Sequence, residues 1–83
     1  MRILLGKVCL LEHHLYGGYF VIPCQLCDNT YPPEYEVLII RGGKIVNSLA
    51  WVGEKNLSLV ESHTLNTDQL ISEWLVECSE EEY

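Results

Sequence analysis

Four cysteines are the residues of this chain best suited to chemistry, and Cys24 and Cys27 form a Cys-X-X-Cys pair. A structural zinc site needs four thiolate or imidazole ligands, usually from two such pairs. A two-residue hairpin turn at Gly17-Gly18 would place Cys9 and His13 on the same sheet face as Cys24. Together with Cys27 they form the candidate zinc site. A single pair is a weak signal, and small buried apolar cysteines are the preferred interpretation. We therefore expect no metal and no cofactor.

Other catalytic chemistry finds little support in the residue pattern. A redox Cys-X-X-Cys lies at the start of a helix, which lowers the thiol pKa, whereas turn-forming residues follow Cys27 here. The neighbouring His13 and His14 would point to opposite faces of a strand. The chain has no glycine-rich phosphate loop, no metalloprotease helix motif and no nucleophile elbow. The sequence therefore predicts a protein that is not an enzyme.

The charge of the chain is concentrated at one end. The segment 61–83 holds seven carboxylates and no lysine or arginine, and the net charge of the whole chain is −7. Within it, Glu73 and Glu77 stand one helical turn apart and repel each other, and further glutamates lie at the negative end of the helix dipole. Such local conflicts indicate a function. The predicted partner-binding residues are Asp68, Glu73, Glu77, Glu80 and Glu81.

A basic groove on another protein is the partner that this charge pattern favours. Carboxylates one turn apart are about 6 Å apart along a helix axis, roughly the spacing of successive phosphates, so the helix could act as a nucleic-acid mimic. The leading hypothesis is a small acidic protein-binding module, an inhibitor that docks its C-terminal helix into such a groove. The alternatives are the small zinc-stabilised domain and a structural subunit of a larger assembly. A solvating helix face with a frayed acidic tail remains the plain interpretation of the same residues.

In size, acidity and absence of catalytic motifs, the chain is similar to phage-encoded inhibitors and to small bacterial immunity proteins. This resemblance is one of composition and length, and it carries over no individual residue. It implies a protein partner. The negative charge argues against direct contact with nucleic acid or an anionic membrane, and no apolar run reaches the roughly 18–20 residues of a membrane span. No signal segment is evident, so we expect a cytoplasmic protein, with self-association left open.

The elements that would position these residues follow from two Gly-Gly pairs, each of which suits a type I′ hairpin turn. The first turn, at Gly17-Gly18, predicts that Tyr16 pairs with Tyr19, and that Phe20 faces inward. The second turn, at Gly42-Gly43, predicts the pairs Arg41 with Lys44, Ile40 with Ile45, Ile39 with Val46 and Leu38 with Asn47.

The chain is expected to form a single domain over residues 1–83, with an α+β fold. Apolar spacing predicts one helix, capped by Asn66 or Thr67, that packs on the sheet through Leu70, Ile71, Trp74, Leu75 and Cys78. The sheet is five-stranded, mainly antiparallel and twisted, and can curl into a small barrel. The second hairpin is apolar on both faces, while one helix covers only one, which motivates the structural-subunit alternative. The predicted strands span residues 2–15, 19–24, 35–41, 44–52 and 57–64, and the helix spans 67–80.

Overall fold

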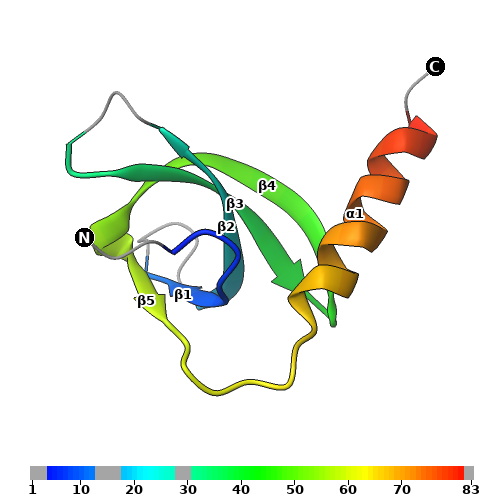
Figure 1. Ribbon diagram of the computed structural model, residues 1–83, viewed down its shortest axis with the longest axis horizontal. Coiled ribbons are helices and arrows are strands. Elements are labelled where there is room, and N and C mark those ends of the chain that lie inside the picture. Colours follow the sequence, from blue (N-terminus) through cyan, green and yellow to red (C-terminus); the bar gives the residue numbers. More distant parts are fainter. Residues whose placement is uncertain (1–3, 13–17, 28–30, 82–83) are drawn as a thin grey trace.

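The protein folds into one five-stranded antiparallel sheet and one C-terminal helix, which confirms the predicted α+β class. The computed structural model describes residues 4–12, 18–27 and 31–81. The strand order in the sheet is β4-β3-β2-β1-β5, so the sheet is strongly curved but open, and it does not close into a barrel (Figure 1). The elements are β1 (Cys9–Leu11), β2 (Tyr19–Cys27), β3 (Glu34–Arg41), β4 (Lys44–Gly53), a 3-10 turn (Glu54–Asn56), β5 (Leu57–Leu59) and α1 (Thr67–Glu81).

Each face of the sheet carries its own apolar cluster. On the concave side the sheet curls round residues that include Tyr35, Val37 and Cys9, which are at most 2% exposed. On the outer side, Ile22, Leu38 and Ile45 pack with α1. Alternate residues of β3 therefore enter different clusters, as expected for a strand covered on both sides. The face that the helix leaves uncovered is buried by the curvature of the sheet itself (Figure 1).

The second predicted hairpin is confirmed at its tip. Gly42 and Gly43 have φ angles of 63° and 79°, the positive values that a type I′ turn requires. Arg41 pairs with Lys44, and Ile40 pairs with Ile45, as predicted. The next two predicted pairs are wrong, because a bulge in β4 pairs Ile39 with Asn47 and Leu38 with Ser48. The bulge leaves Val46 exposed and turns Leu49 toward the concave cluster.

A second bulge in β4 lies opposite β3 between Tyr35 and Val37. Trp51 is in this bulge with a φ of 58°, and its side chain is 46% exposed. A bulky residue rarely adopts this left-handed backbone conformation, which costs about 1–2 kcal/mol for any residue with a Cβ. The bulge thus presents a large aromatic side chain at the surface of the outermost strand.

The predicted register of the first hairpin is wrong. Leu11 pairs with Tyr19 and Cys9 pairs with Val21, so the connection spans residues 12–18 instead of two glycines. The expected partner Tyr16 and the turn residue Gly17 lie outside the described residues. This register turns Val21 toward the concave cluster and leaves Phe20, predicted to face inward, 45% exposed on the outer side. Ile22, predicted to share a face with Phe20, is fully buried against the helix cluster.

The first and last strands are shorter than predicted. The strand expected over residues 2–15 is represented among the described residues by Cys9–Leu11 alone. A tight turn precedes it, where Gly6 has a φ of 78° and the N–H of Lys7 donates to the carbonyl of Leu4. The strand expected over 57–64 ends at Leu59, because its pairing partner β1 is short. The last backbone bond between the two segments joins the N–H of Val60 to the carbonyl of Val8. The strands expected over 19–24, 35–41 and 44–52 and the helix over 67–80 agree within three residues with the observed elements.

Helix α1 packs on the sheet through its first half. Leu70 is 6% exposed and joins the outer cluster, and Ile71 and Trp74 pack against it partly buried. Further along, Leu75 and Val76 are 59% and 56% exposed, and the C-terminal end of the helix stands away from the sheet (Figure 1). The predicted apolar stripe is thus correct at Leu70, Ile71 and Trp74 and wrong for Leu75. Among the described residues, no helix has the length and apolar character to cross a membrane.

Candidate functional site

The acidic helix begins at an N-cap that local sequence explains. The side-chain Oδ1 of Asn66 accepts the N–H of Gln69 at 3.1 Å, and the carbonyl of Asn66 accepts the N–H of Leu70 at 3.0 Å. The side-chain bond satisfies the N–H of Gln69, a donor that the first turn leaves without an intrahelical partner, and the backbone bond is the first i→i−4 bond of the helix. Of the two predicted caps, Asn66 fills the position, and Thr67 is the first helical residue. Asp68 follows in the first turn, where the helix dipole favours a carboxylate.

The predicted partner-binding residues occupy two sides of α1. Glu73 and Glu77 are exposed and lie one turn apart in a single row, which the position of Glu80 continues. Asp68 lies about 140° round the helix axis from Glu73, so it does not join this row. The side chains of Glu80 and Glu81 lie outside the described part of the structure, although their backbone is helical.

Among the described side chains of the row, Glu73 and Glu77 each have a contact that orients the carboxylate. The side-chain amide of Gln69 donates to Oε1 of Glu73 at 3.1 Å. Nζ of Lys44, from the tip of the β3–β4 hairpin, lies 3.7 Å from Oε1 of Glu77, and the two side chains remain 59% and 48% exposed. An ion pair so exposed is worth at most about 1 kcal/mol. The carboxylates of Glu73 and Glu77 are therefore oriented but still accessible to another molecule.

An apolar side chain accompanies the carboxylates. Val76 is three residues after Glu73 and four before Glu80, so it lies beside the row on the helix surface. Leu75 lies on the opposite side of α1. We call Glu73, Val76, Glu77 and Glu80 the acidic row. This side of the second half of α1 therefore combines ionised groups with an exposed apolar side chain.

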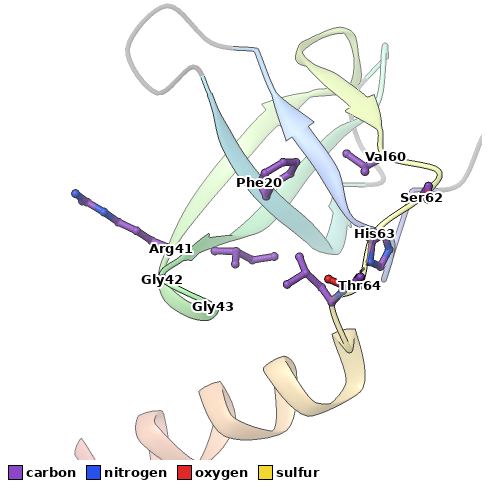
Figure 2. A pocket seen from close by; sticks show the side chains of 10 residues that line it. Phe20, Arg41, Gly42, Gly43, Val60, Ser62, His63 and Thr64 are labelled. Atoms are coloured by element: carbon purple, nitrogen blue, oxygen red, sulfur yellow. Dashed lines mark hydrogen bonds between the residues drawn. The ribbon is translucent and has the colours of Figure 1, made fainter.

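A groove that the sequence did not reveal lies next to this helix. It has a volume of about 550 Å³ and is bounded by β2, the tip of the β3–β4 hairpin and the connection between β5 and α1 (Figure 2). Phe20, Ile40 and Val60 give it an apolar lining, and Ser62, His63 and Thr64 form a more polar side. We call this the hairpin groove. Its lining comes from three separated segments, so no local sequence pattern marks it.

The polar side of the hairpin groove is shaped by the connection to α1. The N–H of Leu65 donates to Nδ1 of His63 at 3.2 Å, which holds the imidazole beside the chain. Arg41 is on the rim, and Figure 2 shows its side chain reaching away from the groove. A smaller hollow of about 250 Å³ shares Gly43, Thr64 and Leu65 with the groove and extends to Glu73. The hairpin groove and the acidic row therefore belong to one continuous surface.

The cysteines are distributed differently from the predicted zinc site. Cys9 is fully buried in the concave cluster, which agrees with its interpretation as a buried apolar residue, whereas Cys24 is exposed, contrary to that interpretation. The shared face predicted for them is wrong, because the observed register turns Cys9 inward. Cys27 is half-buried at the end of β2, and His13 lies outside the described residues. In the described ranges, no cluster of three or more histidine, cysteine or acidic side chains is arranged to hold a metal ion.

The thiol of Cys24 is in a poor environment for nucleophilic chemistry. It lies at the irregular pairing between Pro23 and Gln25, and its Sγ donates to Oε2 of Glu36 at 3.4 Å. Partial burial, together with the hydrogen bond to Glu36 and its negative charge, raises the pKa of Cys24 from 9.0 to about 11. Because the thiolate is the reactive form, this thiol is almost wholly unreactive near neutral pH.

Comparison with protein-family models, with curated proteins and with solved structures finds no significant match to this chain.

Proposed function

We propose that the protein is a protein-binding module that uses the second half of α1 as its docking element. The observation that supports this most directly is that the apolar packing of α1 on the sheet comes from Leu70, Ile71 and Trp74, while Val76 stays 56% exposed beside Glu73 and Glu77. These exposed carboxylates and the exposed valine contribute little to the protein's own core, so they are available for contact with a partner. The arrangement fits a partner groove with an apolar floor and a basic rim.

The expected activity is inhibition by occupancy of that groove. A row of carboxylates on a helix suits a groove that otherwise binds a phosphate backbone, so a nucleic-acid-binding protein is the partner class that we favour. Charge would speed the encounter and select the partner, whereas the apolar contact would hold the complex together. The cytoplasmic location expected from the sequence is part of the same proposal.

The experiment that tests this proposal compares two pairs of matched variants. Proteins retained from a lysate by the wild-type chain are identified, and the affinity of the main one is then measured with purified components. The double reversal Glu73→Lys/Glu77→Lys is compared with Glu36→Lys/Glu54→Lys, which changes the net charge equally but on the sheet and the turn after β4. We expect about a tenfold or larger loss at low salt for the helix reversal alone.

The second pair separates the apolar contact from charge. Val76→Ala removes the apolar member of the acidic row, and Leu75→Ala removes a similarly exposed side chain from the other side of the same helix. We expect weaker binding for Val76→Ala and no change for Leu75→Ala. Equal effects within both pairs would show that the second half of α1 is not the docking element, and the proposal would be rejected.

A further inference from the structure

The hairpin groove is a candidate second contact area on the same side of the molecule as the acidic row. The volume of the groove, about 550 Å³, lies within the range of about 300–1,000 Å³ that is usual for ligand sites. Its apolar lining is available to an incoming group, since Phe20 is 45% exposed over the outer side of β2. In contrast, Ile40 forms a buried base at 7% exposure. A side chain entering the groove would meet an apolar base and an aromatic wall.

The path from the groove to the helix is open and changes in charge along its length. The adjoining hollow ends at Gln69 and Glu73, which lie on the acidic side of α1. At the far end, Arg41 is on the rim. Polypeptide lying along this path would therefore place an apolar side chain in the groove and basic side chains against Glu73 and Glu77.

Charge also decides against a second copy of the chain as the occupant. The net charge is −7, and the segment that adjoins the groove holds seven carboxylates without a base. Two such surfaces brought together would repel each other. A positively charged segment is attracted by the same negative charge, so a basic partner is favoured over a second copy of the chain.

Building on the proposed function, we infer that the hairpin groove binds an apolar anchor side chain of the partner, carried on a segment whose lysine or arginine residues contact the acidic row. The partner is thus recognised by an apolar residue beside a basic run. The anchor would supply most of the affinity, because a desolvated aromatic or aliphatic side chain in a pocket is the usual hot spot of an interface.

The test uses three synthetic peptides of equal length with blocked ends. The first has a tryptophan and a leucine at one end and a run of lysines at the other, the second replaces the two apolar residues with glycine, and the third replaces the lysines with glutamate. Each is titrated into the ¹⁵N-labelled full chain, and backbone amide shifts are followed. For the first peptide we expect shifts at both Val60 and Val76, and for the second at Val76 alone.

Two variants link the shifts to the groove. Phe20→Ala removes the aromatic wall, and we expect it to weaken binding of the first peptide about tenfold, which corresponds to about 1.4 kcal/mol. Val46→Ala, a 42% exposed position outside the groove lining, is the matched control and should leave binding unchanged. Thr64→Phe, which fills the groove from an exposed position, should weaken the same peptide while preserving the fold.

The outcomes separate this inference from the proposed function. Shifts on α1 without shifts in the groove would overturn the groove inference and leave the proposed function standing. Shifts in the groove without any on α1 would contradict the proposed function. Equal binding of the glutamate peptide would overturn the basic character of the partner. Concentration-dependent groove shifts in the free protein would identify a second copy as the occupant and would equally overturn the inference.

Discussion

Truncation of one buried leucine tests how α1 is held on the sheet. Leu70 is 6% exposed and, among the side chains of α1 that the structure describes, is the one in the buried part of the outer cluster, where it packs with Ile40 and Ile45. We expect Leu70→Ala to destabilise the protein. Leu75→Ala is the matched control, because it makes the same chemical change on the same helix at a side chain that is 59% exposed.

The magnitude follows from the surroundings of Leu70. Leucine-to-alanine changes in protein cores cost about 2–5 kcal/mol, and the lower values belong to sites that can relax. The hollow of about 250 Å³ beside Leu70 lets solvent and neighbours adjust. We therefore expect a loss of about 2–3 kcal/mol for Leu70→Ala and less than about 0.5 kcal/mol for Leu75→Ala. The helix propensities of leucine and alanine enter both variants equally, so they cancel in the difference.

Urea unfolding followed by circular dichroism and by tryptophan fluorescence measures both values. With an m value of about 1–2 kcal/mol/M for a chain of this size, Leu70→Ala should lower the unfolding midpoint by about 1–3 M. Trp74 packs against the same cluster, so the tryptophan fluorescence, to which the half-exposed Trp51 also contributes, includes a signal from docking. Equal losses for the two variants, or a loss below about 0.5 kcal/mol for Leu70→Ala, would refute the docking of α1 through its first half.

Three further predictions concern single residues. Asn66→Ala removes the cap bond to Gln69, and it should cost about 1 kcal/mol in unfolding free energy together with some helical circular-dichroism signal; an unchanged protein would show that the cap contributes nothing. Trp51→Gly should be about 1 kcal/mol more stable than Trp51→Ala, because glycine alone tolerates a φ of 58° without strain, and the reverse order in thermal unfolding would contradict this. The rate of Cys24 alkylation, followed by peptide mass spectrometry, should rise up to about pH 11, and this rise should shift to lower pH in Glu36→Gln. The raised pKa means that the folded state holds the thiol proton more tightly than the unfolded state. The contribution of Cys24 to the free energy of unfolding is therefore complete below pH 9.0 and is lost as pH rises toward about 11.

Local rules were sufficient where the interactions themselves are local. The β3–β4 turn was predictable because two consecutive glycines meet the demand for positive φ at Gly42 and Gly43. The start of α1 was predictable because Asn66 can bond the backbone three residues ahead. The buried contact of α1 followed from helical spacing, and Leu70 is indeed its centre.

The register of the first hairpin was not predictable from its glycines. Both Gly17-Gly18 and a longer connection satisfy the turn chemistry, and the choice depends on which face of β2 is buried. Val21 is fully buried in the concave cluster, and the observed register, in which Leu11 pairs with Tyr19, places it there beside Cys9. A register shift by an odd number of residues exchanges the two faces, which explains the exposure of Phe20.

The acidic row of the candidate site was predicted from the sequence, whereas the hairpin groove was not. The acidic row is contiguous in sequence, so its charge and spacing could be read directly. The hairpin groove depends on the true register of β2, which exposes Phe20, on the tip of the β3–β4 hairpin and on the path of residues 60–65. The meeting of these three segments is set by tertiary pairing, so no periodicity in the sequence could indicate the groove.

The two bulges in β4 have a consequence for the behaviour of the protein at high concentration. A straight outer strand of ten residues would offer an unbroken series of backbone donors and acceptors, which is a template for fibril growth. The pairing shifts opposite Ile39–Ile40 and Tyr35–Val37 interrupt that series twice and twist the strand. An incoming strand can therefore match only short stretches of β4, which protects this small, β-rich chain from amyloid-like assembly through that side.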